Sequence, residues 1–357
     1  MMLKSKQDLK NIVIKKIDNR VYEQVKRNWD NVAKPLNGLG RFEEMIARIG
    51  AITGTDKVSI KKRAVITMCA DNGIVNEGVS QSGQEVTSIV TEFMGKNASS
   101  VGKMAKVAGA DIFPVDIGIN SEQQFEGVIQ HKVVMGTRDF LVEPAMTTGQ
   151  VLQAISIGID MVKQLKDEGY ELIGTGEMGI GNTTTSSAIA AVLLGCSVES
   201  VTGRGAGLSD SGLCRKIEVI KQAIEKYGFT EKTEALEVLT TVGGLDIAGL
   251  TGVFIGGAVY GVPIVIDGVI SAVAALVAEA IIPGTKEFML ASHRSKEPAV
   301  NEIFNRLGAY PVIDGQLALG EGTGTVMLFS LLDVAMALYE SDTSFGEMQI
   351  EQYERYQ

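Results

Sequence analysis

The sequence predicts an α/β protein built on a parallel sheet that is flanked by helices. From residue 64 onward, short apolar runs alternate with longer amphipathic stretches, which is the pattern of repeated strand–helix units. Apolar residues make up 45% of the 357 residues, aromatic residues only 6%, and glycine occurs 41 times, as in tightly packed α/β proteins. Acids or glycine-rich stretches follow several apolar runs, at the strand ends where parallel sheets bind their ligands.

The individual elements follow from apolar spacing and from residues that start or stop helices. Amphipathic helix is expected over residues 5–50, with a break at residues 34–41, where Pro35 and two glycines prevent a continuous helix. Strands are expected over residues 64–70, 111–116, 171–174, 262–266 and 288–292. Later helices are expected to start at Ser82, Thr147, Ser186, Ser209 and Val326, the first two with capping-box spacing. In the first of them, one face is expected to pack on the core: Val86, Ile89, Val90, Phe93 and Met94.

The charged residues exclude two classes of partner. The chain has 33 Lys and Arg against 43 Asp and Glu, a formal net charge of −10. Since no basic block occurs, neither nucleic acid nor a membrane surface is an expected partner. Three cysteines without a C-x-x-C pair and two histidines without a ligand cluster predict reduced thiols and no metal site. The N-terminus lacks the apolar core of a signal peptide, so a cytoplasmic location is expected.

One uncharged stretch, residues 247–266, has the length of a membrane span. It contains Gly252 and Gly256, a four-residue spacing that also occurs where membrane helices pack closely. Pro263 and five glycines divide the stretch, and basic flanks are missing nearby. A glycine-rich helix followed by a buried strand that ends at Asp267 is therefore the favoured interpretation.

The stretch of residues 174–184 is the strongest candidate for a binding site. It follows a short strand, contains Gly174, Gly176, Gly179 and Gly181, and precedes a helix. Bare backbone N–H groups at a strand-to-helix turn are typical of phosphate sites. Glu177, in the middle of the stretch, does not suit a plain phosphate site and indicates a second task near a hydroxyl or a cation.

A dinucleotide site is the main competing interpretation. Gly174, Gly176 and Gly179 match the spacing G-x-G-x-x-G, and Glu199 follows about 20 residues later. Glu177 would then lie beside a pyrophosphate, and Gly181 continues the glycine run where the helix should already have begun. An NAD-dependent oxidoreductase is therefore the less favoured hypothesis.

Two charged residues outside this stretch have alternative roles. Lys216 lies near the start of a helix and is either a solvated surface lysine or a counter-charge for a phosphate. Glu321 stands between Gly320 and Gly322, before a helix. It is either a first-turn acid that interacts with the helix dipole or a general base held close to a ligand. The flanking glycines favour the base.

Nine short motifs together resemble those of one enzyme family and span residues 30–340. They are Lys34-Pro35 with Leu39-Gly40-Arg41, Ala70 to Gly73, Gln84 to Thr87, Pro144 to Thr147, Gly176 to Thr184, Gly203 to Gly205, Asp267-Gly268, Ser292 to Pro298 and Leu319 to Gly322. In this order they resemble the nicotinate-nucleotide:dimethylbenzimidazole phosphoribosyltransferases of cobalamin lower-ligand assembly.

The resemblance implies a reaction, a fold and an assembly. Phosphoribose would pass from nicotinate mononucleotide to 5,6-dimethylbenzimidazole or a similar base, giving an α-ribazole-type 5′-phosphate and nicotinate. The fold would be a large Rossmann-like domain, residues 56–299, with a small helical domain built from residues 1–55 and 300–357. A homodimer is implied, and no cofactor or metal.

The resemblance also implies the site residues. Glu321 would be the general base and Glu177 a second acid near the reacting centre. Substrate contacts would come from Ser80, Gln84, Gly176, Met178, Gly179, Ile180, Gly181, Asn182, Thr183, Gly205, Lys216, Ser292, Leu319 and Gly320.

Two departures from the family pattern leave the acceptor open. Ser80-Gln81-Ser82-Gly83 stands where relatives often have an aromatic residue and a proline, and Ala299-Val300 where Gly-His is usual. A less aromatic pocket also suits phenol or p-cresol, which relatives attach through oxygen. Some of these relatives work as two paralogous chains, so a heterodimer and a non-catalytic partner subunit are alternatives.

Overall fold

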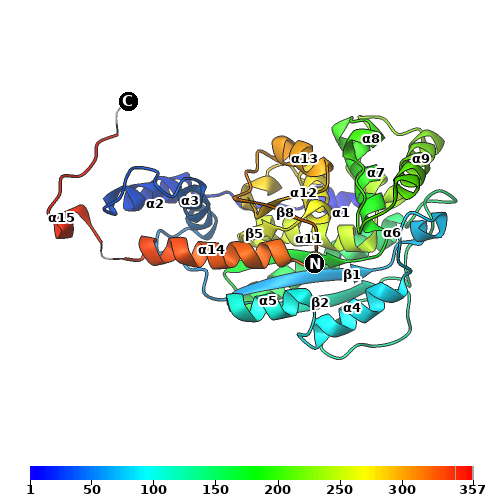
Figure 1. The fold of residues 1–357 in the computed structure, drawn as a ribbon, viewed down its shortest axis with the longest axis horizontal. Coiled ribbons are helices and arrows are strands. Elements are labelled where there is room, and N and C mark those ends of the chain that lie inside the picture. The colour runs from blue at the N-terminus through cyan, green and yellow to red at the C-terminus, as the bar shows by residue number, and fades with distance from the viewer. Residues whose placement is uncertain (342, 356–357) are drawn as a thin grey trace.

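The structure, a computed structural model, is described here for residues 1–341 and 343–355. Its centre is a parallel sheet of six strands in the order β3-β2-β1-β4-β5-β6 (Figure 1). The strands are β1 (Arg63–Ala70), β2 (Asp111–Gly118), β3 (Ile129–Gln130), β4 (Leu172–Met178), β5 (Ile264–Ile266) and β6 (Met289–Ala291). The chain order reverses between β1 and β4, the switch point where such sheets open a crevice. The predicted α/β fold is confirmed.

Helices cover both faces of this sheet. One face carries α4 (Glu85–Gly95), α5 (Ser100–Ala108) and α14 (Thr323–Tyr339), and the other carries α11 (Leu245–Tyr260) and α12 (Val269–Ile281), with α6 (Thr148–Asp167) packed on α11. The remaining helices are α1 (Lys6–Lys10), α2 (Asn19–Asn31), α3 (Arg41–Thr53), α7 (Asn182–Leu194), α8 (Val198–Val201), α9 (Asp210–Tyr227), α10 (Ala235–Val242), α13 (Ala299–Leu307) and α15 (Phe345–Met348). Two short 3₁₀ helices span Gly73–Glu77 and Thr285–Phe288.

The sheet separates two hydrophobic cores, because side chains alternate between its faces. In β1, Ile66 and Met68 belong to the core under α6, α11 and α12. Val65 and Cys69, one position along, belong to the core under α3, α5 and α14. All eight residues of β1 are buried, as expected for a central parallel strand.

The glycine spacing of residues 247–266 brings two helices, α11 and α6, into close contact. A Cβ at Gly252 would lie 2.1 Å from the carbonyl oxygen of Ile155, and one at Gly158 would lie 2.0 Å from that of Gly249. Backbone therefore packs on backbone between α11 and α6. The interpretation of this stretch as a helix and a strand is confirmed, and no helix in the described residues has the length and apolarity of a membrane span.

A smaller group of helices extends from one end of the sheet. There, α2 packs on α3, and α3 contacts α14, which continues onto β4 and α5 (Figure 1). In contrast, α13 packs on α12 and α7 of the large part. Next to it, β7 (His293–Ser295) pairs with β8 (Ile313–Leu317) in a separate two-stranded sheet. The division at residues 55 and 300 stays a prediction, and its residues 342 and 356–357 lie outside the described part of the chain.

Several local expectations were wrong and one was confirmed. The helix expected over residues 5–50 is also interrupted at residues 11–18, which are not helical. Strand β4 runs on to Met178, four residues beyond its predicted end. The predicted capping box at Ser82 is wrong, since α4 begins after Gln84 without a side-chain cap, whereas that at Thr147 is confirmed. The predicted core face of α4 is wrong in part: Met94 is buried and Val90 packs against the core, but Ile89 and Phe93 are 53% and 48% exposed, because two threonines of another face are buried instead.

Candidate active site

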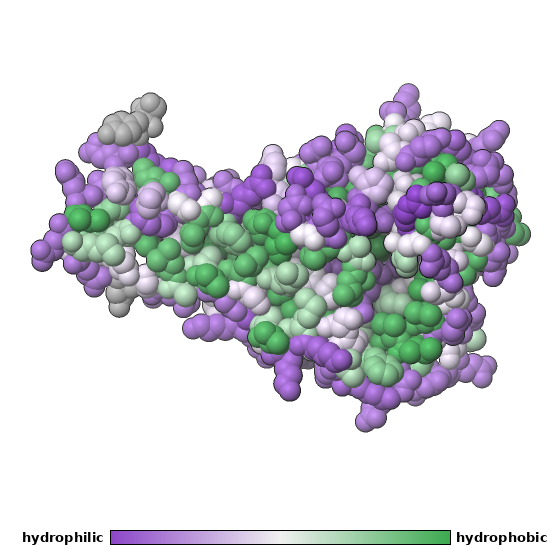
Figure 2. Space-filling model, viewed as in Figure 1, coloured by the Kyte–Doolittle hydropathy of each residue, from purple (hydrophilic) through white to green (hydrophobic). Residues whose placement is uncertain are grey.

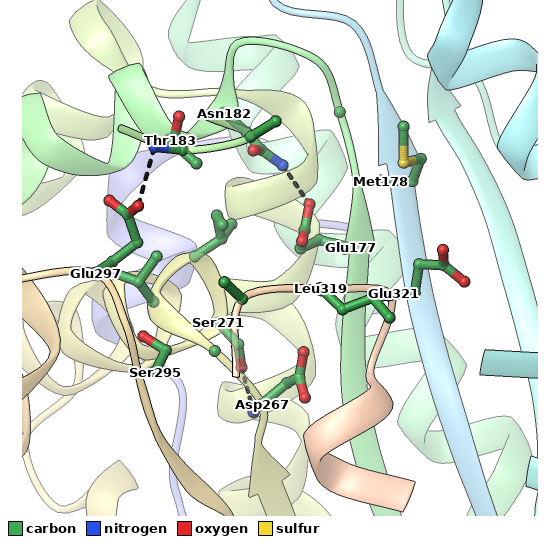
Figure 3. A pocket seen from close by; sticks show the side chains of 18 of the residues that line it. Glu177, Met178, Asn182, Thr183, Asp267, Ser271, Ser295, Glu297, Leu319 and Glu321 are labelled. Carbon is green, nitrogen blue, oxygen red and sulfur yellow. Dashed lines mark hydrogen bonds between the residues drawn. The ribbon is translucent and has the colours of Figure 1, made fainter. Parts of the chain in front are cut away.

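A cavity of about 310 Å³ opens at the carboxyl ends of the central strands. Its walls come from the end of β4 and the start of α7, the loop after β5, the two-stranded sheet, the loop before α14, and one face of α4. Figure 3 shows Thr183 and Glu297 on one side of this space, Glu321 and Met178 on the opposite side, and Glu177 between them. The site thus combines segments from distant parts of the sequence.

The glycines of β4 serve helix packing instead of phosphate binding. A Cβ at Gly174 would lie 1.9 Å from Cγ2 of Thr325 in α14, and one at Gly176 would lie 2.3 Å from the carbonyl oxygen of Glu321. Both glycines lie inside the strand. The predicted turn therefore begins only at Gly179, and the G-x-G-x-x-G spacing that suggested a dinucleotide site has no matching geometry.

The start of α7 forms the electropositive end of the cavity. Gly181 has a φ of 95°, which favours glycine, and no side chain caps the helix. The helix dipole favours an anion at this end, although the N–H groups of Asn182 and Thr184 already donate to the carbonyls of Gly179 and Gly181. Lys216 of α9 is fully buried and donates from Nζ to Oγ1 of Thr183 at 2.8 Å and to the carbonyl of Gly203 at 3.2 Å. Burial lowers the pKa of Lys216 to about 8. The surface alternative for Lys216 is therefore wrong.

A carboxylate already occupies part of this end. Glu297 accepts a hydrogen bond from the N–H of Gly205 at 2.9 Å, and its charge opposes the burial-driven fall in the pKa of Lys216. Gly205 has a φ of 54°, and a Cβ there would lie 2.7 Å from Oγ1 of Thr183. The turn at Gly205 is thus pressed closely against the start of α7.

The half-buried Glu177 forms a polar cluster with two buried side chains, Asn182 and Asp246. Nδ2 of Asn182 donates to Oε2 of Glu177 and, at 3.0 Å, to Oδ2 of Asp246. Burial raises the pKa of Glu177 to about 8 and that of Asp246 to about 6. A carboxyl group with a raised pKa that lines a cavity, as Glu177 does, is typical of functional sites.

Glu321 stands in a strained loop before α14. Gly320, Glu321 and Gly322 all have positive φ values, of 84°, 62° and 97°, which is unfavourable for the glutamate. Its Oε2 accepts a hydrogen bond from the N–H of Val101, in the first turn of α5, at 3.0 Å. A helix N-terminus stabilises a carboxylate.

Asp267, at the end of β5, holds this loop in place. Its Oδ2 accepts the N–H of Gly322 at 3.2 Å and its Oδ1 that of Thr325 at 3.1 Å. The carboxyl group thereby caps α14 from another element of the fold. Burial raises the pKa of Asp267 to about 7. Hydrogen bonds to Asp267 thus connect the backbone around Glu321 to the end of strand β5.

The side of the cavity near Glu321 is largely apolar. Met178 and Leu319 lie on this side (Figure 3), and Val86 and Val90 of α4 also line the cavity. Their spacing of four residues puts Val86 and Val90 on the same side of the helix. An apolar space with one carboxylate suits a flat organic ring that carries an exchangeable proton. The cavity thus has an anion end, a central acid and an apolar end with a second carboxylate.

Comparison with known proteins identifies the family. The model of a phosphoribosyltransferase family, DBI_PRT, matches residues 14–350. The chain is 44% identical over 337 residues to nicotinate-nucleotide–dimethylbenzimidazole phosphoribosyltransferase of Clostridium acetobutylicum, covering 94% of this chain and 96% of that one. The chain belongs to this phosphoribosyltransferase family.

Further relatives agree with this membership. The enzyme of the same name from Acetivibrio thermocellus is 44% identical over 93% of this chain and 94% of its own. The crystal structure of CobT from Thermus thermophilus matches with a TM-score of 0.88 and 33% identity, over 94% of this chain and all of that one. The phosphoribosyltransferase fold therefore extends over nearly the whole chain.

The structure brings most of the expected site residues of the phosphoribosyltransferase together. Ten of them line the cavity: Glu177, Met178, Gly179, Ile180, Asn182, Thr183, Gly205, Leu319, Gly320 and Glu321. Ser80 and Gly181 line a smaller adjoining space, and Lys216 lies behind Thr183. Gly176 lies inside β4.

Two expected site residues have other partners. Oε1 of Gln84 accepts from Nδ2 of Asn120, and its own Nε2 donates to the carbonyl of Asn72. The hydroxyl of Ser292 is buried and donates to the carbonyl of Ile266 at 2.7 Å. A direct substrate contact by either residue has no support in this arrangement.

Sequence reasoning missed several residues of the cavity. It identified Asp267 only as a strand-end acid and gave His293 no role, yet both line the space, with Ser82, Val86, Val90, Ser271, Ser295 and Glu297. For Ser295 and Glu297, the motif at residues 292–298 was an available signal. Burial lowers the pKa of His293 to about 4, so at neutral pH this imidazole is uncharged.

Proposed function

We propose that this chain transfers phosphoribose from nicotinate mononucleotide to 5,6-dimethylbenzimidazole, releasing nicotinate and an α-ribazole-type 5′-phosphate. The observation that carries the proposal is the order of groups along one cavity: the uncapped start of α7, backed by Lys216 behind Thr183, then Glu177, then Glu321 beside an apolar wall. This order matches a phosphate, a ribose and an aromatic acceptor. The names of the relatives support the two substrates.

In the proposed mechanism, Glu177 stabilises positive charge at the ribose. The bond between C1′ and the pyridine nitrogen breaks readily, because its electron pair neutralises a cationic ring. Positive charge then develops at C1′, where a nearby carboxylate lowers the barrier. The high pKa of Glu177 in the free protein falls when a cationic ring binds beside it, since an opposite charge favours the ionised form.

Glu321 acts as the general base at the other end of the cavity. One benzimidazole nitrogen attacks C1′ from the face opposite nicotinate and forms the new bond, which inverts the β to the α configuration. The other ring nitrogen would then keep a proton and a positive charge. A carboxylate at Glu321 removes this proton, a contribution of roughly 10²–10⁴-fold in rate.

The alternative functions have less support. Glu199, which an NAD site would need near the ribose, is exposed and pairs with Lys221 on the surface. The curated relatives described above are named for dimethylbenzimidazole, so a phenolic acceptor is not favoured. The three free cysteines support the expected cytoplasmic location.

The proposal is tested by supplying purified protein with nicotinate mononucleotide and 5,6-dimethylbenzimidazole. Nicotinate and an α-ribazole phosphate should form in equal amounts, and nicotinate should not form when the acceptor is left out. Release of nicotinate without acceptor would instead identify a nucleotide hydrolase. No release with the acceptor would contradict the proposed transfer, unless a paralogous chain restores it, which would support the heterodimer.

A homodimer is the proposed assembly. Figure 2 shows an apolar band that runs along α14 and reaches α4. Its residues are Met327, Leu331 and Val334 on α14 and Ile89 and Phe93 on α4, all of them exposed. Exposed apolar residues repeated at helical spacing on two helices are typical of a covered surface, and a second copy of this chain has a matching surface to cover it.

A further inference from the structure

The acid in the centre of the cavity is linked to a second carboxyl group that does not line it. Asp246 lies in the first turn of α11 and is completely buried. Its Oδ2 accepts from Nδ2 of Asn182 at 3.0 Å, and the same nitrogen donates to Glu177. Since an amide NH₂ has two protons, each carboxyl group takes one of them. The orientation of this amide is therefore set from both sides.

Asp246 is itself fixed in position. Its Oδ1 accepts the N–H of Ile247 at 3.0 Å. A Cβ at Gly179 would lie 2.7 Å from its Oδ2, and one at Gly244 would lie 2.3 Å from its Oδ1. Backbone on two sides thus confines the carboxyl group, and only glycine leaves room for it. A side chain held this firmly can orient a neighbour.

We propose that Asp246 is a positioning residue for phosphoribosyl transfer, which acts through the amide of Asn182 to fix the direction and the protonation of Glu177. This inference rests on the proposed function. If Asn182 lost its bond to Asp246, its side chain could rotate and release Glu177 from the reacting centre. Misplacing a catalytic group by about 1 Å can cost roughly 10²-fold in rate.

Several polar and titratable groups surround Glu177 and influence its pKa. Asn182 of α7 donates to it, and the carboxyl groups of Asp246 on α11, Asp267 after β5 and Glu321 before α14 all disfavour its ionised form. The charge of Glu177 in turn raises the pKa of the Cys69 thiol on β1. Asp71, after β1, raises the pKa of Asp246 in turn. Removing the charge of Asp246 alone should therefore lower the pKa of Glu177.

The variants Asp246→Asn and Asp246→Ala separate the two parts of the proposal. Asparagine keeps an oxygen that accepts from Asn182 but removes the charge, whereas alanine removes both. We expect kcat to fall about tenfold or more in Asp246→Ala and less in Asp246→Asn, while Kd for nicotinate mononucleotide changes less than about threefold. Asp116→Asn is the matched control, because Asp116 is equally buried, pairs with Lys132 and lies outside the cavity.

The decisive test is the same substitution in a Glu177→Gln background. If Asp246 acts through Glu177, Asp246→Asn should have little further effect on kcat there, which is the signature of coupled residues. An equal loss in both backgrounds would overturn the proposal. Failure of the wild-type protein to transfer phosphoribose would instead contradict the proposed function.

A second measurement does not depend on turnover. In protein labelled with ¹³C at glutamate carboxyl groups, the Glu177 resonance, assigned by its absence in Glu177→Gln, reports the titration directly. We expect its midpoint to move to lower pH in Asp246→Asn and to stay unchanged in Asp116→Asn. An unchanged midpoint in Asp246→Asn, with the protein folded, would overturn the coupling.

Discussion

At the scale of single residues, Glu321 combines backbone strain with two fixed neighbours. Its φ of 62° is unfavourable for any residue other than glycine. Two contacts nevertheless hold the loop: the carboxylate of Asp267 accepts the N–H of Gly322, and the N–H of Val101 donates to the carboxylate of Glu321. Strain that is maintained by surrounding contacts is common at catalytic positions. The fold thus gives up some stability to place one carboxylate.

Replacing Glu321 by glutamine should slow turnover without weakening nucleotide binding. The amide keeps the size of the side chain but cannot accept the benzimidazole proton. We expect kcat to fall roughly 10²–10⁴-fold, while Kd for nicotinate mononucleotide, measured by calorimetry, stays close to that of the wild type. Near-normal turnover would exclude Glu321 as the base.

Replacing Lys216 by alanine should raise KM for the nucleotide by about tenfold to hundredfold, the value of a charged hydrogen bond. Lys221→Ala is the control on the same helix, since Lys221 is exposed and pairs with Glu199. An unchanged KM in Lys216→Ala would contradict a phosphate role.

The pH dependence of binding provides an independent test of Lys216. Because its pKa is lowered to about 8, the ammonium form is present below pH 8 and is lost as the pH rises through 8. Affinity for the nucleotide should therefore decline above pH 8 in the wild type, and the decline should be flatter in Lys216→Ala. Equal declines in both proteins would assign the effect to another group.

At the scale of elements, the central feature is the contact between β4 and the start of α14. Thr325 and the carbonyl of Glu321 occupy the volume that side chains at Gly174 and Gly176 would fill. The hydroxyl of Thr325 also bonds to the carbonyl of Thr175 at 3.3 Å. The strand that carries Glu177 and the loop that carries Glu321 are thereby held as one unit.

Gly176→Ala should disturb this unit. Its Cβ would meet the carbonyl oxygen of Glu321 at 2.3 Å, so the loop must shift, and such overpacking typically costs about 1–3 kcal/mol of stability. We expect kcat to fall by a larger factor than the affinity for nucleotide. Gly149→Ala, in the first turn of α6, is the control and should retain full activity, because its Cβ would meet only Oγ1 of Thr147 at 3.9 Å, an ordinary contact distance. Thermal unfolding and steady-state kinetics measure both effects, and an active, stable Gly176→Ala would contradict this contact.

At the scale of the whole molecule, the apolar band over α14 and α4 predicts self-association. Val334, on the α14 part of the band, is 73% exposed, so Val334→Asp should separate the proposed homodimer, because it would bury a charge in the interface. Val13→Asp is the control, because Val13 is 83% exposed but lies outside the band. Light scattering after gel filtration gives the mass; a wild-type monomer, or a Val334→Asp dimer, would contradict the proposed interface.

Site residues whose burial depends on neighbours in the same helix could be predicted from the sequence, whereas those whose role depends on contacts with distant segments could not. Lys216 could have been placed inside, because it shares helical spacing with Val219, Ile220 and Ala223, which are all buried. The lining role of Val86 and Val90 could not, since apolar residues on a helix look alike whether they face a core, a cavity or a partner. Gln84 was predicted from a family motif. A motif indicates resemblance to a family but does not show where the side chain points.

The sequence by itself determined the alternation of strands and helices, the glycine-rich stretch of residues 174–184 as a candidate site, and Glu177 and Glu321 as the acids of interest. Local spacing and short motifs carry this information because each concerns a few neighbouring residues. Only the tertiary structure decided what lies beside each glycine, that Asp267 caps α14, and that Asp246 reaches Glu177 through Asn182. These contacts join residues far apart in the chain, and packing alone determines which of them meet.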